Sequence, residues 1–282
     1  MLALIGGSGL YSLEGLEIEE HLVIDTPFGS PSTAISRGVY QGQSILFLPR
    51  HGVAHQFLPH EVNYRANIFA LKKLGATQVF SISAAGSLRE DIRPGDLALV
   101  SQYFDHTRGQ RQQTFFGQGV SAHIATANLC CPALSADIID AAERINLPLH
   151  QDKTYGCIEG PRLGTRAESH FLRSAANCDL VGMTNVPEAF LAREAQMAYC
   201  SVCLITDYDC WKDDSSQHVS MDQFFATYGG ALTKAQALFA EFIRSPLRDT
   251  PNAIRHSLEN AMLTPPQNMN TEQQQWFEIL CQ

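Results

Sequence analysis

Short apolar segments typical of buried β-strands alternate along this chain with segments of helical periodicity. The predicted strands are residues 2–5, 44–48, 79–82, 97–103, 179–183 and 199–206. Apolar residues three and four apart predict one helix from Val62 to Gly75 and another after a Ser135 cap, and the Thr165-x-x-Glu168 capping box predicts a third. This alternation indicates an α/β fold whose largely parallel sheet is covered by helices on both faces.

The length and composition fit one domain with a short extension. At 282 residues and 45% hydrophobic content, the chain can bury a sizeable core. The helical pattern ends near Ile243, and Ser245 opens a tail rich in Asn, Gln and Pro. We predict a domain over residues 1–244 and a C-terminal extension over residues 245–282, either a docked pair of helices or a partly ordered appendage. The residues from Pro265 onward are expected to be loosely held.

Charge and cysteine usage restrict the partners and the compartment. A formal net charge of -9 and a pI near 5.5 argue against nucleic acid and anionic membranes as partners. The chain shows no export signal and no stretch of membrane-spanning length. Eight cysteines are too sparse for a disulfide scaffold. Cys200-x-x-Cys203 has metal or redox spacing, but it lies in an apolar run, so core packing is the favoured interpretation. We therefore expect a soluble cytoplasmic protein.

Two carboxylates, Asp207 and Asp209, stand one residue apart where the apolar run 199–205 ends. Acids at the end of a buried strand are costly unless something uses them. Alternation along an extended backbone would place both on one side, where they can address a single ligand. An isolated Asp-x-Asp is more often a solvated turn with a helix cap, so the functional interpretation depends on the rest of the chain.

Three other strand ends carry groups suited to an anion. Residues 6–9 are Gly-Gly-Ser-Gly, Arg50 and His51 follow the second predicted strand, and residues 83–87 offer hydroxyls and exposed amides. Taken singly, these features could be a tight turn or a surface salt bridge. Ligands of open α/β sheets gather beyond the carboxyl ends of strands, so the segments are expected to converge. The glycines lack the G-x-G-x-x-G spacing that a nicotinamide oxidoreductase would require.

Two later segments, 158–162 and 182–188, are also irregular and polar. In the first, Glu159 and Arg162 could simply pair with each other. In the second, Pro187 and Glu188 favour a helix start, because proline suits the first helical position and an acid suits the positive end of the helix dipole.

Seven motifs, in the same order, resemble those of the purine nucleoside phosphorylase and 5′-methylthioadenosine phosphorylase family, and the match is close to the methylthioadenosine branch. The motifs are Gly6-Gly7-Ser8-Gly9-Leu10, Pro49-Arg50-His51-Gly52, Val62-Asn63-Tyr64-Arg65-Ala66-Asn67, Gly86-Ser87-Leu88, Glu159-Gly160-Pro161-Arg162, Met183-Thr184 and Thr206-Asp207-Tyr208-Asp209-Cys210-Trp211. The resemblance covers about residues 2–243. It implies a single-domain nucleoside phosphorylase fold, with a mixed central β-sheet flanked by helices on both faces, and usually a homotrimer.

The reaction that the resemblance implies is phosphorolysis of methylthioadenosine to adenine and methylthioribose 1-phosphate, with inorganic phosphate as co-substrate and with no metal or other cofactor. Adenosine is then a possible secondary substrate. One alternative keeps the fold and changes the substrate to methylthioinosine or a 6-oxopurine nucleoside, for which family members typically carry Asn at the position of Asp207. Another alternative is a non-catalytic nucleoside-binding protein.

The resemblance also assigns site residues. It implies a phosphate site of Ser8, Arg50, His51, Ser83, Ala84 and Thr184, and a nucleoside site of Met183, Leu163, His123, Met221 and Phe224, with Asp207 and Asp209 as catalytic acids at the purine. Leu263 is the candidate for an apolar residue borrowed from a neighbouring subunit. Leu163 and Gly164 depart from the family, which often has an aromatic residue and a Ser there. A desolvated Asp207 would hold a proton that it could donate to purine N7 as the base leaves.

Overall fold

The computed structural model describes residues 1–282 except 8–9, 11–12 and 215–220, and it describes residues 221, 223 and 224 by their backbone alone. The strands are β1 Leu2–Gly6, β2 Glu17–Leu22, β3 Ile35–Tyr40, β4 Gln43–Pro49, β5 Gln78–Ser87, β6 Leu97–His106, β7 His150–Ile158, β8 Leu180–Gly182 and β9 Ala198–Asp207. The α-helices are α1 Tyr64–Lys73, α2 Pro132–Arg144, α3 Arg166–His170, α4 Asn185–Glu194, α5 Met221–Arg244, α6 Asn252–Arg255 and α7 Thr271–Cys281.

One nine-stranded sheet organises the described chain, in the order β2-β3-β4-β1-β5-β8-β7-β6-β9. Strand β5 also pairs with β9, so β5, β8, β7, β6 and β9 close into a ring. The β1–β4, β1–β5, β5–β9, β6–β7 and β7–β8 pairs are parallel, and the other pairs are antiparallel. This confirms the mixed sheet that the resemblance implies, whereas strand–helix alternation alone underestimates the antiparallel pairs.

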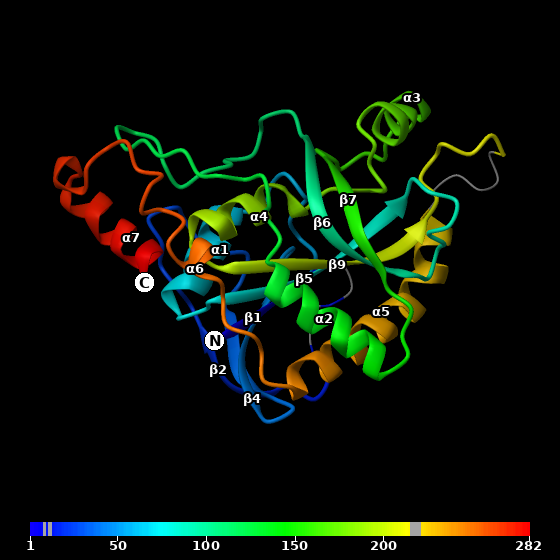
Figure 1. Ribbon diagram of the computed structural model, residues 1–282, viewed down its shortest axis with the longest axis horizontal. Helices are drawn as coiled ribbons and strands as arrows, with labels where there is room; N and C mark the ends of the chain where they lie inside the picture. Colours follow the sequence, from blue (N-terminus) through cyan, green and yellow to red (C-terminus); the bar gives the residue numbers. More distant parts are fainter. Residues whose placement is uncertain (8–9, 11–12, 215–220) are drawn as a thin grey trace.

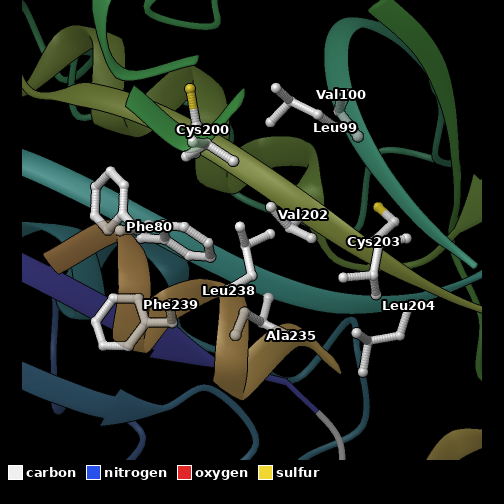
Figure 2. Packing of buried hydrophobic residues seen from close by; sticks show 14 of the residues in the cluster. Phe80, Leu99, Val100, Cys200, Val202, Cys203, Leu204, Ala235, Leu238 and Phe239 are labelled. Atoms are coloured by element: carbon white, nitrogen blue, oxygen red, sulfur yellow. The ribbon is translucent and has the colours of Figure 1, made fainter. Parts of the chain in front are cut away.

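The sheet is buried on both faces, as the alternating burial of β1 illustrates. Leu2 and Leu4 belong to a core cluster that includes α2 and α5, whereas Ala3 and Ile5 belong to a second cluster with α1, α4 and α7. Figure 1 shows α2 and α5 together on one side of the sheet and α1, α4 and α7 on the other. Side chains of β5, β9 and α5, among them Phe80, interdigitate in the first cluster (Figure 2). Helices therefore cover both faces, as predicted.

Local sequence signals mark the starts of α1 and α3. The side chain of Asn63 caps α1 by accepting from the N–H of Ala66, and the predicted capping box at Thr165 is present at the start of α3. The predicted Ser135 cap is wrong, because α2 begins at Pro132 with Cys131 as its N-cap residue. Proline suits the first helical position, so the helix starts earlier than its apolar spacing indicates.

Seven of the eight cysteines are buried, and Cys281 is exposed. Cys200 and Cys203 lie on β9 and are fully buried in the first core cluster, as the favoured interpretation predicts. All eight cysteines are free. No helix in the described part of the chain combines the length and apolar character needed to cross a membrane.

The C-terminal tail is folded onto the rest of the chain, which contradicts the expectation that residues from Pro265 onward are loosely held. A capping box formed by Asn270 and Gln273 starts α7. The indole of Trp276 on this helix is 7% exposed and packs edge-on against the rings of Phe28 and Phe116. Figure 1 shows α7 in red at the outer side of α1. Met269, Trp276 and Leu280 are buried in the second core cluster, which holds the tail in place.

Candidate active site

A cavity of about 610 Å³ opens where the strands of the sheet end. Most of its lining comes from residues at or just after the carboxyl ends of β1, β4, β5, β7, β8 and β9. Nine predicted site residues lie around it: Arg50, His51, Ser83, Ala84, Leu163, Met183, Thr184, Asp207 and Asp209. Segments up to 159 residues apart, counted from position 50 to position 209, therefore meet in one place.

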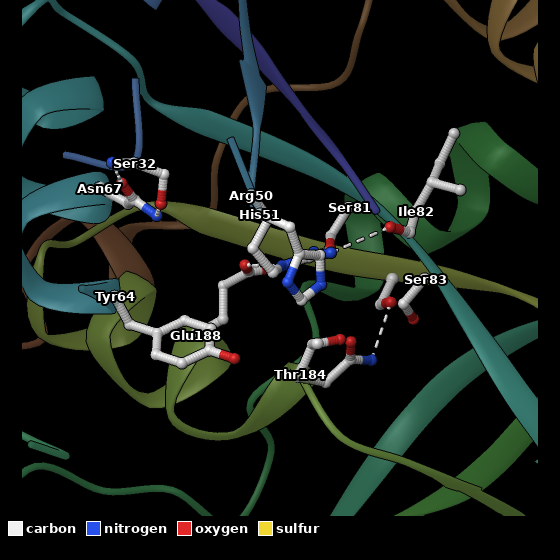
Figure 3. A network of polar contacts seen from close by, with 12 residues as sticks. Ser32, Arg50, His51, Tyr64, Asn67, Ser81, Ile82, Ser83, Thr184 and Glu188 are labelled. Carbon is white, nitrogen blue, oxygen red and sulfur yellow. Dashed lines mark hydrogen bonds and ion pairs between the residues drawn. The ribbon is translucent and has the colours of Figure 1, made fainter. Parts of the chain in front are cut away.

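The guanidinium of Arg50 is fully buried at one end of this cavity. Its Nε and Nη2 donate to the two carboxylate oxygens of Glu188 over 2.6 and 2.8 Å, and Nη2 also donates to Ser81 Oγ over 2.7 Å. Nη1 donates to the carbonyl of Ile82 over 3.3 Å (Figure 3). Among the described residues these bonds occupy four of the five N–H groups of an arginine, so one N–H on Nη1 is left for an anion.

Just after β1, the main chain at Gly7 comes close to Ile82 and to the Arg50 side chain. A side chain on Gly7 would place its Cβ 2.6 Å from the carbonyl of Ile82 and 3.3 Å from Nη1 of Arg50. Only glycine fits this position without displacing the strand.

The guanidinium of Arg50 and the carboxylate of Glu188 form an ion pair that carries no net charge. Burial alone would lower the pKa of Arg50, but the adjacent carboxylate of Glu188 more than offsets this and raises the pKa above its usual range. Arg50 is therefore charged, and it is paired with Glu188. Recognition of an anion here depends on the direction of its donor rather than on a net positive charge.

His51 is neutral in its buried position. Burial and the nearby Arg50 cation lower the pKa of His51 to about 4. Its Nδ1 lies 2.9 Å from the carbonyl oxygen of Phe57, and because a carbonyl only accepts, Nδ1 carries the proton. Nε2 is then an acceptor, suited to a hydroxyl of phosphate or sugar. The ring of His55 stacks on His51 at 4.5 Å and also lines the cavity, although no sequence motif points to it.

Asp207 and Asp209 are buried at the other end. Asp207 is the last residue of β9, and its Oδ2 accepts from Thr206 Oγ1 over 2.6 Å. Asp209 lies beyond the strand with a positive φ of 54°, so it does not continue the extended alternation used to predict the pair. Gly86 allows the close approach, since a Cβ there would stand 2.8 Å from Asp207 Oδ1.

The pKa of each carboxyl group is raised above its usual value. Burial raises the pKa of Asp207, and the neighbouring charge of Asp209 adds to the rise. Burial also raises the pKa of Asp209. A raised pKa at a cavity wall is the property that a general acid needs.

Ser83 and Thr184 lie near Arg50 and His51 (Figure 3). Ser83 Oγ lies 3.4 Å from the sulfur of Cys203, and the N–H of Thr184 donates to the hydroxyl of Tyr155 over 3.3 Å. Beside the acids, a Cβ at Gly164 would stand 4.0 Å from each carboxylate oxygen of Asp209, so the missing side chain leaves space there.

Four predicted nucleoside- or phosphate-site residues are not placed in this cavity. His123 is exposed and does not line it; its backbone N–H donates to the carbonyl of Ala261 over 2.8 Å. Ser8 and the side chains of Met221 and Phe224 lie outside the described residues. The next turn of α5 does reach the cavity, through Phe225 and Tyr228.

One pairing considered from the sequence is wrong, and one important residue is missed. Glu159 pairs with Arg111 over 2.7 Å, and Arg162 pairs instead with Glu168 over 2.6 Å. Arg111 lies in the segment between β6 and α2, where no motif points to it. Its role can be seen only once the strand ends are assembled.

Among the described residues there is no group of three or more His, Cys, Asp or Glu side chains that could hold a metal ion.

A family model described as the phosphorylase superfamily matches residues 1–244. The chain belongs to this superfamily. It is 42% identical to the S-methyl-5′-thioadenosine phosphorylase of Geobacter sulfurreducens, over 99% of this chain and 97% of that one. It is 48% identical to the enzyme of that name from Hyperthermus butylicus, over 75% of this chain and 77% of that one.

Solved structures of the superfamily share the fold over almost the whole chain. A methylthioadenosine phosphorylase from an antarctic soil metagenomic library has a TM-score of 0.91 and 40% identity, covering 99% of this chain and 98% of that one. Methylthioadenosine phosphorylase from Schistosoma mansoni in complex with adenine has a TM-score of 0.85 and 31% identity, covering 93% and 99%. The predicted nucleoside phosphorylase fold is thereby confirmed.

Proposed function

We propose that this chain catalyses phosphorolysis of S-methyl-5′-thioadenosine, giving adenine and S-methyl-5-thioribose 1-phosphate. Inorganic phosphate is the co-substrate, and no metal or other cofactor takes part. One observation carries the proposal: a single cavity holds the buried guanidinium of Arg50 at one end and the buried carboxyls of Asp207 and Asp209 at the other. The names and high coverage of the relatives support the same reaction.

The Arg50 end suits the attacking oxyanion. The open N–H of Arg50, the hydroxyls of Ser83 and Thr184 and the neutral imidazole of His51 offer donors and an acceptor around one position. Holding phosphate beneath the sugar makes the attack effectively unimolecular. The anion also favours the positive charge that develops on the ribose as the C–N bond breaks.

The aspartate end suits a leaving adenine. As the bond to ribose breaks, negative charge moves into the purine, and a protonated Asp207 donates to N7 and neutralises it. Asp209 accepts from the exocyclic amine of adenine. A 6-oxopurine presents an acceptor at that position and offers no N–H there for Asp209 to accept from, and this favours adenine over hypoxanthine or guanine as the released base.

We further propose a homotrimer in which each subunit completes a neighbour's cavity. Residues 121–123 pair with 261–263: Ala122 bridges to Met262, and the N–H of Leu263 donates to the carbonyl of Ser121 over 2.9 Å. This pairing places His123 and Leu263 close together on the surface, and Leu263 is 64% exposed. They suit the 5′ end of a neighbour's nucleoside, where an apolar contact would favour methylthio over hydroxyl by about 1–3 kcal/mol and leave adenosine as a secondary substrate.

The protein's small-molecule partners are then the nucleoside and phosphate, without nucleic acid or membrane. The cytoplasm is the proposed compartment, because eight free cysteines suit a reducing environment.

The test is release of the base from four nucleosides, methylthioadenosine, methylthioinosine, adenosine and inosine, each with and without phosphate. Methylthioadenosine with phosphate is expected to be cleaved fastest, and omission of phosphate is expected to stop the reaction. A preference of tenfold or more for the inosine compounds, about 1.4 kcal/mol, would overturn the assignment of Asp207 and favour a 6-oxopurine phosphorylase. Binding of methylthioadenosine without cleavage would favour a non-catalytic nucleoside-binding protein.

A further inference from the structure

Arg111 bonds to the chain just beyond the paired strands β7 and β8, where the segments that follow both strands line the cavity. It lies in the segment between β6 and α2 and is 5% exposed. Its Nη1 donates to the carbonyls of Met183 and Val186 over 2.6 and 2.7 Å, beyond the end of β8. Its Nη2 donates to the carbonyls of Ile158 and Glu159 over 3.3 and 2.7 Å, at the end of β7.

Every donor of this guanidinium is used. The fifth N–H, on Nε, donates to Glu159 Oε1 over 2.7 Å, and the other oxygen of Glu159 accepts from the backbone N–H of Arg108 over 2.7 Å. An arginine has five N–H groups in a fixed planar fork, so these bonds define both the spacing and the orientation of the two strand ends. Arg111 has no donor left for a substrate, and it does not line the cavity.

The carbonyls that Arg111 holds flank the proposed binding groups. Thr184 of the proposed phosphate site lies between Met183 and Val186, so the segment that carries it is fixed at both ends. On the other side, the chain continues from Glu159 into Pro161, Leu163 and Gly164, which line the cavity beside the acids. Beyond the last residues of the β7–β8 pairing, Arg111 therefore links the segment of the proposed phosphate site to the segment that continues toward the acids.

We infer that Arg111 is a positioning residue for the reaction: its buried guanidinium fixes the Met183–Val186 segment against the end of β7 and so aligns phosphate with the nucleoside. The inference rests on the proposed function and deepens it. A misplacement of about 1 Å at a reacting centre can cost about 100-fold in rate, so loss of this bracket affects turnover more than it affects binding of either substrate alone.

The experiment compares Arg111→Lys and Arg111→Met with wild type in the full-length chain, well below the melting temperature of each. The lysine ammonium retains the charge but cannot span four carbonyls, and the methionine thioether donates no hydrogen bond. Both variants are therefore expected to lose about 100-fold in kcat. The Km values for nucleoside and phosphate are expected to rise less than kcat falls. Arg111→Lys keeps the test available if Arg111→Met does not fold.

Arg193→Met is the matched control. Arg193 is also a buried arginine that donates to backbone carbonyls, those of Asn128 and Leu129, but it does not line the cavity and holds no cavity segment. This control is expected to lose stability and to keep kcat close to wild type. If Arg193→Met lost as much kcat as the Arg111 variants, or if a folded Arg111 variant kept kcat and both Km values within twofold, the inference would be overturned.

A second measurement separates this inference from the proposed reaction. Calorimetric titration with inorganic phosphate needs no turnover, and Arg111→Met is expected to weaken the binding roughly tenfold, about 1.4 kcal/mol. Unchanged phosphate affinity would count against the inference. A wild-type chain that binds phosphate but cleaves no nucleoside would instead count against the proposed function.

Discussion

The backbone N–H of Asp209 donates to Oδ1 of Asp207 over 2.7 Å, so the position of one acid fixes the other. Thr206 Oγ1 holds the remaining oxygen of Asp207 over 2.6 Å. The carboxyl group that faces the cavity is therefore oriented from both sides before any ligand binds.

Asp207→Asn should impair base release far more than folding. The amide can still accept from the N–H of Asp209 and donate to Thr206, but it has no acidic proton. We expect kcat/Km for methylthioadenosine to fall by about 100- to 10,000-fold, measured by release of adenine. The wild-type rate should also fall as the pH rises through the raised pKa of Asp207, because the acid form is then lost, and the variant should lack this decline. Wild-type turnover in the variant would contradict the role.

Glu188→Gln should leave an uncompensated buried cation at Arg50. Breaking a buried pair of this kind costs about 3–5 kcal/mol of unfolding free energy, measurable by urea denaturation. Phosphate should raise the melting temperature of the variant more than that of wild type, because the bound anion supplies the missing negative charge. Sodium chloride at equal ionic strength is the control, and an equal response to both salts would contradict the prediction.

Glu194 should make stability depend on pH. Its carboxylate oxygens accept from Thr114 Oγ1 over 2.6 Å and from the N–H of Phe115 over 2.8 Å, and burial raises the pKa of Glu194 from 4.5 to about 7. The folded state then binds more protons than the unfolded state between pH 4.5 and 7, so the contribution of Glu194 to stability is lost as the pH rises through this window. The rise corresponds to roughly 3 kcal/mol.

The measurement is the difference in unfolding free energy between wild type and Glu194→Gln at several pH values. A difference is needed because His51 acts in the opposite direction: burial lowers its pKa from 6.5 to about 4, so it costs stability as the pH falls through that range. The wild-type advantage over the variant should shrink from pH 4.5 to pH 7. Parallel stability curves would show that Glu194 does not titrate in this window.

Trp276→Ala should release the tail. Removing a buried indole from its contacts with Phe28 and Phe116 costs about 3–5 kcal/mol and should make α7 sensitive to limited proteolysis. Glu278→Ala, an exposed change on the same helix, should alter stability by less than about 0.5 kcal/mol. Equal effects of the two substitutions would contradict the docking of α7 through Trp276.

Hydrophobic patterning predicts strands such as β9 that are buried on both faces. Residues 199–206 are predicted as a strand because their apolar run is uninterrupted, and β9 covers them. Strand β7 is not predicted, because it begins with His150, Gln151, Asp152 and Lys153 and is half exposed there. The exposed strand β2, with the sequence EIEEHL, is not predicted for the same reason.

The site is predictable where strand ends carry unusual polar groups, as at Arg50 and Asp207. It is not predictable where the partners are backbone carbonyls, which every residue possesses and no sequence pattern marks; Arg111 is missed for this reason. His123 is assigned only through the resemblance, and within one chain it does not line the cavity, so its proposed role depends on contacts between chains.

The neutral pair of Arg50 and Glu188 has a consequence for turnover. A sugar phosphate carries its charge out of the pocket at the end of every cycle, and a lone buried cation would hold it strongly and slow its departure. Because Glu188 already balances Arg50, the oxyanion can be aligned well and still leave easily. Departure of the product, the step that limits many efficient enzymes, is therefore expected to be faster than from a pocket with a lone buried cation.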